Sequence, residues 1–157
     1  QALSRVTQPW HLTIVGTGNH LEHCRRLATS LGIAGQVEFA GWVPHRDLEQ
    51  YYARAAFTVV PSRWPEPFGM VGVEAMARGR AVVGFSAGGI PDWLCHGVNG
   101  LLAPAGDVER LAEAIGCLLE DPDQARRLGR RAARVATSRF THTGYLEAMQ
   151  TLLEEVA

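Results

Sequence analysis

The stretch PSRWPEPFGMVGVEAMARG, residues 61–79, decides the fold. An apolar run at residues 55–60 precedes it, and a second at residues 81–85 follows it. Runs of this length indicate buried strands, and the small and apolar residues between them, after a proline-rich loop, are typical of a helix. A strand, a helix and a second strand form the repeating unit of a parallel sheet. We expect residues 55–60 to be a central strand of that sheet, covered on both faces.

The same alternation extends over the whole chain. Strands are predicted at residues 12–15, 37–40, 55–60, 81–85 and 101–103. Apart from the helix in the opening stretch, helices are predicted at about residues 20–31, 46–54, 91–96, 108–119, 122–136 and 142–155, and Asp107 is expected to cap the one that follows it. The predicted fold class is therefore α/β, with a doubly wound parallel sheet in one domain of residues 1–157, of which residues 138–157 form a C-terminal helix.

The composition narrows the classes of function. Of the 157 residues, 46% are hydrophobic, which suits one core of ordinary size. The 15 cationic residues are all arginine and face 16 Asp and Glu, for a net charge of -1, so no basic field favours nucleic acid as a partner. Because lysine is absent, this chain alone cannot form a Schiff base or complete a phosphate site that needs a lysine.

The chain carries no sequence signal for export or for a membrane span. No apolar run approaches the roughly 20 residues of a spanning helix, and the 3 cysteines have unrelated spacings that do not indicate a disulfide framework. We expect a cytoplasmic protein without a transmembrane segment, while an arginine-rich face at residues 126–134 leaves peripheral membrane association open. His20, His23 and Cys24 share one helical turn but lack a fourth ligand, so no metal site is predicted.

Glu66 stands between Pro65 and Pro67. A residue before proline is driven out of the helical region, so Glu66 is expected in the loop beyond the carboxyl end of a strand, where α/β sheets bind ligands. The helix is then expected to begin at Pro67 or Phe68. Its first amides are unpaired and can hold an anion such as phosphate, and they belong to Gly69, Met70 and Val71.

Glu74 is expected on the following helix, at the edge of an apolar stripe formed by Met70, Val73 and Ala77. A carboxylate there needs a polar partner. One candidate is Arg78, four residues later in the favourable order for a helical ion pair. Two ribose hydroxyls would satisfy the carboxylate equally well, and the spacing alone favours the ion pair slightly.

With these residues the chain resembles the retaining glycosyltransferases of the GT-B fold, whose signature is two glutamates separated by seven residues. Here the signature is Glu66, PFGMVGV and Glu74. The surroundings match as well, with a Gly-x-Gly turn at Gly16 and Gly18, then VEFAGWVP, VVPS, AVVGF, GG and NGLL. The resemblance covers about residues 10–120 in the same order.

The resemblance implies the Rossmann-like C-terminal domain of a two-domain enzyme, which binds a nucleoside-diphosphate sugar and needs neither cofactor nor divalent metal. In the family pattern the Glu74 position holds the ribose, and the Glu66 position positions the donor sugar for catalysis. The same pattern implies further donor contacts, with the diphosphate and sugar at Phe68, Gly69, Met70 and Val71, the phosphate side of the cleft at Gly16 and Gly18, and the nucleobase at Gly41, Trp42 and Val43.

Parts of the family pattern have no counterpart here. The family sheet runs in the order 3-2-1-4-5-6, and this sequence resembles only strands 2 to 6, so the central strand is expected to be absent. The diphosphate-binding Arg and Lys and the acceptor-binding N-terminal domain are absent too, and we expect the chain alone to be inactive. A non-catalytic nucleotide-binding or assembly module and a sugar-nucleotide epimerase remain alternatives. Trp42 and Trp64 flank the predicted cleft, and each could equally close the core or stack on a ligand.

Overall fold

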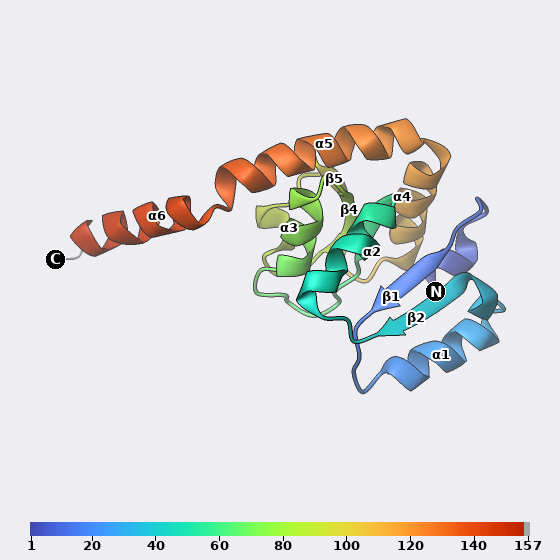
Figure 1. Cartoon of the computed structure of the whole chain (residues 1–157). Coiled ribbons are helices and arrows are strands. Elements are labelled where there is room, and N and C mark those ends of the chain that lie inside the picture. Colours follow the sequence, from blue (N-terminus) through green and yellow to red (C-terminus); the bar gives the residue numbers. More distant parts are fainter. Residues whose placement is uncertain (156–157) are drawn as a thin grey trace.

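Five parallel strands form two separate sheets in the computed structural model, which describes residues 1–155 (Figure 1). The first sheet pairs β1 with β2, and the second has the order β3-β4-β5. The strands are β1 (Leu12–Val15), β2 (Val37–Gly41), β3 (Phe57–Val60), β4 (Ala81–Ser86) and β5 (Gly100–Pro104). All five predicted strands are confirmed, with ends that move by at most two residues.

Helices connect the strands, as predicted for a parallel α/β fold. The α-helices are α1 (Leu21–Ser30), α2 (Leu48–Arg54), α3 (Met70–Ala77), α4 (Val108–Glu120), α5 (Pro122–Arg139) and α6 (His142–Glu155). Asp107 caps α4 as expected, because its Oδ1 accepts the backbone N–H groups of Glu109 and Arg110 at 3.1 and 3.0 Å. Single 3-10 turns complete the elements, at Ala2–Arg5, Ala34–Gln36, His45–Asp47 and Ile90–Asp92.

The helix predicted at residues 91–96 is wrong, because only the turn Ile90–Asp92 forms there. The buried side chain of Asn99 explains the early end. Its amide nitrogen donates to the carbonyl of Trp93, and its oxygen accepts the N–H of Cys95, both at 2.7 Å. These bonds occupy main-chain groups that a continuing helix would need.

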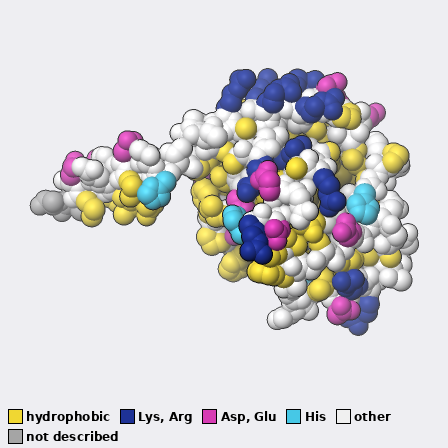
Figure 2. Space-filling view, in the orientation of Figure 1, with side chains coloured by type: hydrophobic (Ala, Val, Ile, Leu, Met, Phe, Trp, Pro, Cys, Tyr) yellow, Lys and Arg dark blue, Asp and Glu magenta, His cyan; other side chains and the backbone are white. Residues whose placement is uncertain are grey.

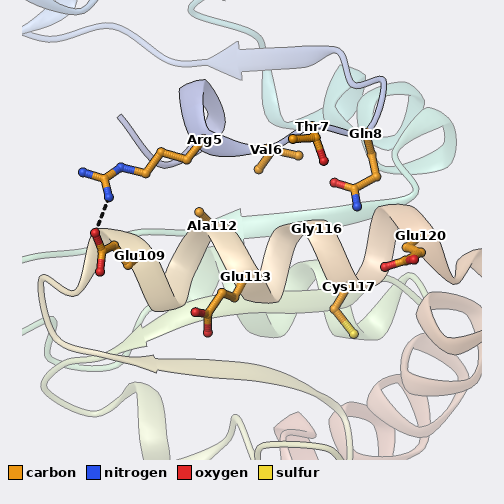
Figure 3. Close-up of a pocket in the computed structure, with 10 residues that line it drawn as sticks. All are labelled: Arg5, Val6, Thr7, Gln8, Glu109, Ala112, Glu113, Gly116, Cys117 and Glu120. Carbon is orange, nitrogen blue, oxygen red and sulfur yellow. Dashed lines mark hydrogen bonds and ion pairs between the residues drawn. The ribbon is translucent and has the colours of Figure 1, made fainter.

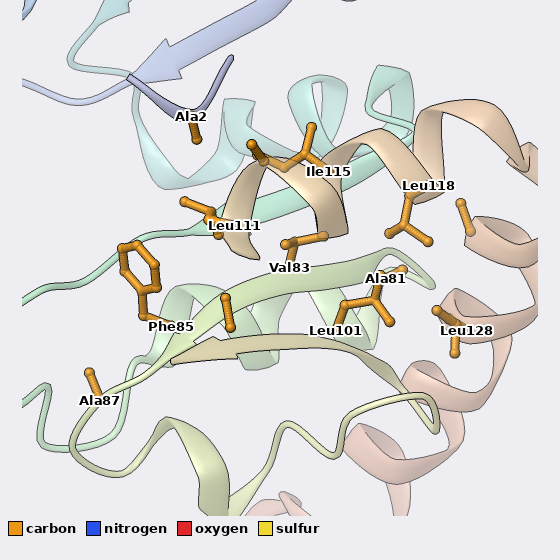
Figure 4. Close-up of a cluster of buried hydrophobic side chains, with 13 residues drawn as sticks. Ala2, Ala81, Val83, Phe85, Ala87, Leu101, Leu111, Ile115, Leu118 and Leu128 are labelled. Carbon is orange, nitrogen blue, oxygen red and sulfur yellow. The ribbon is translucent and has the colours of Figure 1, made fainter. Parts of the chain in front are cut away.

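The β3-β4-β5 sheet is covered on both faces. One core lies between it and α4, where Val83, Phe85 and Leu101 face Leu111 and Ile115 (Figure 4). A second core lies on the opposite face, against α3 and α5, and contains Tyr52, Met76, Val82, Trp93 and Ala132. Because successive strand residues point to opposite faces, the neighbours Val82 and Val83 serve different cores. This confirms the doubly wound arrangement.

The central strand of this sheet is β4, with five of its six residues buried. The prediction that residues 55–60 are a central, doubly covered strand is wrong. In β3 only Val60 is buried, and the strand pairs with β4 alone. Its other edge has no strand partner within residues 1–155, which leaves the side chains half-exposed.

The first sheet is open in the same way. Within the described residues β1 pairs only with β2, and Val15 at its end is 37% exposed. Two parallel sheets, each with an open edge, agree with the expected absence of one strand between β1 and β3. An unpaired edge exposes backbone groups that another strand could pair with.

Helix α5 lies along the body of the molecule, and helix α6 extends away from it (Figure 1). Helix α6 buries none of its residues, and its exposed apolar side chains are Tyr145, Leu146, Met149, Leu152 and Leu153. Helix α5 buries alanine and leucine against the sheet and presents a row of arginines to solvent (Figure 2). None of the helices in residues 1–155 is both long and apolar enough to cross a membrane.

Candidate functional site

The loop that carries Glu66 begins at the carboxyl end of β3 and is held by the loop that follows β4. The N–H of Gly89 donates to the carbonyl of Glu66 at 2.8 Å. Gly88 has a φ of +54°, and a Cβ there would lie 2.1 Å from the same carbonyl oxygen. Only glycine fits this approach, so two adjacent loops fix the main chain of Glu66 at the carboxyl edge of the sheet. The carboxylate itself is half-buried, with the Ser62 hydroxyl at 3.5 Å.

Helix α3 begins at Met70, later than the predicted start at Pro67 or Phe68. The residue Phe68, which precedes the helix, instead contacts buried side chains of the core. The carbonyl of Phe68 accepts the indole N–H of Trp93, and the Phe68 ring packs edge-on against Phe140 with a centroid distance of 5.6 Å. Gly69 then turns the chain with a left-handed φ of +81°, a conformation that glycine adopts without strain.

The start of α3 offers free backbone donors. The N–H of Gly72 donates to the carbonyl of Gly69 at 2.9 Å. For the N–H groups of Gly69, Met70 and Val71, residues 1–155 supply no acceptor, as expected of the first turn of a helix. The side chains of Met70 and Val71 are exposed, so their two amides lie near the surface, whereas Gly69 is buried. An anion can bind there.

The buried face of α3 differs from the predicted one. Met70 and Ala77 are exposed, whereas Gly72, Ala75 and Met76 are buried with the predicted Val73. The reason is that α3 packs against both the sheet and α5, so its burial is not limited to one stripe. At Gly72 the helix backbone rests on the indole of Trp93, so close that a Cβ would lie 2.0 Å from the ring.

Glu74 lies half-buried on α3, and its predicted ion pair with Arg78 is wrong. The Nε–H of Arg78 donates instead to Oε2 of Glu49 at 2.7 Å, and its Nη1 donates to the main-chain carbonyl of Glu74 at 3.0 Å. No cation in the described part of the chain lies within 4.0 Å of the Glu74 carboxylate. Its only protein donor there is the hydroxyl of Tyr52, 3.4 Å from Oε2. The carboxylate therefore keeps most of its acceptor capacity.

Tyr52 was not among the predicted site residues. It is buried on α2, and desolvation together with the nearby charge of Glu74 raises its pKa to about 12, so its hydroxyl stays protonated and can donate. The sequence does indicate that Tyr52 lies on the inner face of its helix. Leu48 and Tyr52 are four residues apart and so share the inner face of α2, whereas the adjacent Tyr51 does not.

A second group of predicted residues lies at the ends of β1 and β2. The N–H of Gly16 donates to the carbonyl of Gly41 at 2.7 Å, which joins the turns that follow the two strands. No atom lies within 4 Å of the position a Cβ would take at Gly16, Gly18 or Gly41. Next to Gly41, Trp42 is 72% exposed and Val43 is half-buried. These residues surround a surface that a ligand can approach.

Comparison with known proteins then decides the family. The family described as "Glycosyl transferases group 1" matches residues 1–135. The chain belongs to this glycosyltransferase family. D-inositol 3-phosphate glycosyltransferase 1 of Catenulispora acidiphila is 41% identical to this group 1 chain over 128 residues, which are 82% of the chain and 29% of the relative. The exopolysaccharide phosphotransferase SCO2592 of Streptomyces coelicolor is 35% identical over 148 residues, 94% of the chain and 15% of the relative.

The solved structures confirm the fold. HepE of Anabaena in complex with UDP and glucose superposes with a TM-score of 0.88 at 31% identity, over 98% of the group 1 chain and 43% of HepE. The chain thus has the Rossmann-like fold of the C-terminal domain of a GT-B glycosyltransferase. It spans 15 to 43% of the lengths of these three relatives.

In the group 1 chain the two groups of predicted residues remain separate. Glu66, Glu74 and the start of α3 form one group and the glycines near β1 form the other, and no hydrogen bond or ion pair within residues 1–155 joins them. Trp42 and Trp64, 72% and 65% exposed, do not close the core. That role belongs to Trp93, which is fully buried.

The volume of the surface hollows does not indicate the site. A hollow of about 620 Å³ lies between residues 5–8 and α4, beside the ion pair of Arg5 with Glu109 (Figure 3). None of the predicted residues lines it. Of the residues that the structure describes, no three His, Cys, Asp or Glu are grouped so that they could hold a metal ion.

Proposed function

We propose that this chain is the nucleotide-sugar-binding domain of a retaining glycosyltransferase. The enzyme would transfer a sugar from a nucleoside-diphosphate sugar to an acceptor held by an N-terminal domain outside this chain. One observation carries the proposal: among residues 1–155 the Glu74 carboxylate has no cation partner, and it lies on the same helix as the free amides of Met70 and Val71. A group that accepts hydrogen bonds from hydroxyls thus lies beside groups that bind an anion, which suits the ribose and diphosphate of one ligand.

Each part of the site then has a role toward the donor. Glu74 accepts hydrogen bonds from the ribose hydroxyls, and the amides at the start of α3 hold part of the diphosphate. Glu66, fixed by Gly88 and Gly89, positions the donor sugar. Catalysis then depends on orientation and on electrostatic stabilisation of the departing diphosphate, so the proposal requires no metal or cofactor from these residues.

The remainder of the donor site would come from outside the chain. A strand between β1 and β3 would pair their open edges and join the two groups of predicted residues in one sheet. An Arg and a Lys near that strand would complete the diphosphate site, since this chain contains no lysine. We therefore expect the 157-residue chain to be inactive by itself.

Isothermal titration of the two-domain enzyme with UDP-glucose and GDP-mannose tests the proposal. Replacing Glu74 by glutamine keeps its size but removes the charge, and we expect donor affinity to fall about tenfold or more, because hydrogen bonds to a charged group are the strong ones. Glu113→Gln is the matched control, since Glu113 is an exposed glutamate on α4 paired with Arg110. Failure of the unmodified enzyme to bind any nucleotide sugar would refute the proposal.

A second candidate is a non-catalytic nucleotide-binding module of the same fold. It is favoured by the absence of lysine, because this chain alone cannot complete a diphosphate site that needs one. Transfer of labelled sugar to an acceptor separates the two, because the module would bind the donor without turnover. Formation of an epimeric nucleotide sugar in the absence of acceptor would indicate an epimerase instead.

A further inference from the structure

Arg78 joins helices α2 and α3 next to the proposed ribose-binding carboxylate. Its Nε–H donates to Glu49 on α2 at 2.7 Å, and its guanidinium carbon lies 4.7 Å from the centre of the Tyr52 ring. Its Nη1 donates to the main-chain carbonyl of Glu74. The one cation that the sequence places within reach of the Glu74 carboxylate is therefore directed to another carboxylate.

Two glutamates compete for this guanidinium. Glu74 precedes Arg78 by four residues, the favourable order for an ion pair within a helix. If Glu49 lost its charge, Arg78 could rotate onto the Glu74 carboxylate without any change of the backbone. The ribose hydroxyls would then have to displace a charged donor before they could bind.

The hydroxyl of Tyr52 also contacts the Glu74 carboxylate. Its hydroxyl is 3.4 Å from both Oε2 of Glu74 and the carbonyl of Val71, and it has one proton to donate. The charged oxygen is the stronger acceptor, so the proton is expected to point to Glu74. The side chain of Tyr52 is buried and held under Arg78, so it cannot easily leave this position.

We infer that Glu49 and Tyr52 are positioning residues for the donor site: Glu49 holds Arg78 away from Glu74, and Tyr52 fixes the orientation of the Glu74 carboxylate. The inference rests on the proposed function, in which Glu74 binds the ribose. Neither residue touches the donor. Both act through the charge and the direction of one carboxylate.

The test of Glu49 is a charge rescue, measured by isothermal titration of the two-domain enzyme with the nucleotide sugar that it binds. Glu49→Gln should weaken donor affinity about two- to fivefold, the range expected of one competing ion pair. Adding Arg78→Gln to that variant removes the competitor and should restore most of the lost affinity. A purely structural role of Glu49 predicts no restoration. Glu113→Gln, which breaks an exposed ion pair with Arg110, should leave affinity unchanged.

The test of Tyr52 removes only its hydroxyl. Tyr52→Phe should raise the KM for the donor about two- to tenfold, the range expected when one hydrogen bond is lost, with kcat nearly unchanged. Tyr51→Phe is the control, because the neighbouring ring lies against Arg54 and away from Glu74.

The outcomes separate this inference from the proposed function. If Glu74→Gln loses donor binding while Glu49→Gln and Tyr52→Phe bind as tightly as the unmodified enzyme, the inference is wrong and the proposed function stands. A double variant of Glu49 and Arg78 that binds no better than Glu49→Gln also refutes the role of Glu49. If Glu74→Gln itself binds normally, the proposed function fails.

Discussion

Replacing Gly72 by alanine should destabilise the fold, because the indole of Trp93 occupies the place of the new methyl group. A Cβ at Gly72 would lie 2.0 Å from Cη2 and 2.7 Å from Cζ2 of Trp93. The indole has little freedom to move, since it is fully buried and donates to the carbonyl of Phe68. Overpacking costs about 1–3 kcal/mol and the lost hydrogen bond about 1 kcal/mol, while alanine regains about 1 kcal/mol in the helix. The free energy of unfolding should therefore fall by about 1–3 kcal/mol.

Urea denaturation followed by far-UV circular dichroism measures this change. Gly35→Ala is the control, because Gly35 lies in the exposed turn Ala34–Gln36 with no atom within 4 Å of the Cβ position. Its effect should stay within about 0.5 kcal/mol. Trp93→Phe, combined with Gly72→Ala, gives the methyl group room, so the double variant should lose less stability than the two single variants together.

Two results would contradict this reasoning. Gly72→Ala could prove as stable as the unmodified protein, or the losses in the double variant could be strictly additive. Either result would mean that Gly72 and Trp93 do not touch in the folded protein, and the packing that holds Phe68 before the start of α3 would need another explanation.

Two further predictions concern a buried amide and a buried phenol. Asn99→Ala should lower the free energy of unfolding by about 2–4 kcal/mol. Asn99 is 1% exposed, and its loss leaves the carbonyl of Trp93 and the N–H of Cys95 without partners. Equal urea midpoints for the two proteins would refute this prediction. Tyr52 has a folded-state pKa raised from its ordinary 10.0 to about 12, so between these values the folded protein retains a proton that the unfolded chain loses. Stability should thus fall as pH rises from 10.0 to about 12, and Tyr52→Phe should flatten this slope in urea titrations; an unchanged slope would contradict the burial of the phenol.

The strands and most helices could be predicted from the sequence, because apolar runs and helical periodicity depend only on neighbours along the chain. The position of β3 in the sheet could not be predicted in this way. Residues 55–60 are as apolar as a central strand, but their exposure is set by whether a strand lies on each side. Within residues 1–155 only one strand, β4, lies beside β3.

The candidate site shows the same division. The placement of Glu66 and Glu74 around the start of a helix follows from local rules for proline, glycine and helix geometry. The partner of Arg78 does not, because Glu49 lies 29 residues earlier and reaches Arg78 only through the packing of α2 on α3. Spacing within α3 could identify Glu74 as a candidate partner of Arg78, but it could not identify Glu49 on α2.

Which tryptophan is buried depends on the residues around it in the sequence. Trp64 lies between Arg63 and Pro65 and is exposed, whereas Trp93 lies close to Ile90 and directly before Leu94 and is fully buried. The apolar neighbours of Trp93 were a usable signal for the core. The glycine that receives its ring, Gly72, could not be identified without the packing of α3.

A crystal structure of the proposed two-domain enzyme with a bound nucleotide sugar tests the central claim most directly. We predict that the ribose hydroxyls lie within hydrogen-bonding distance of the Glu74 carboxylate, that the N–H groups of Met70 and Val71 face the diphosphate, and that Arg78 remains on Glu49. A nucleotide bound elsewhere, such as in the hollow between residues 5–8 and α4, or a Glu74 carboxylate paired with Arg78 in the complex, would contradict the account.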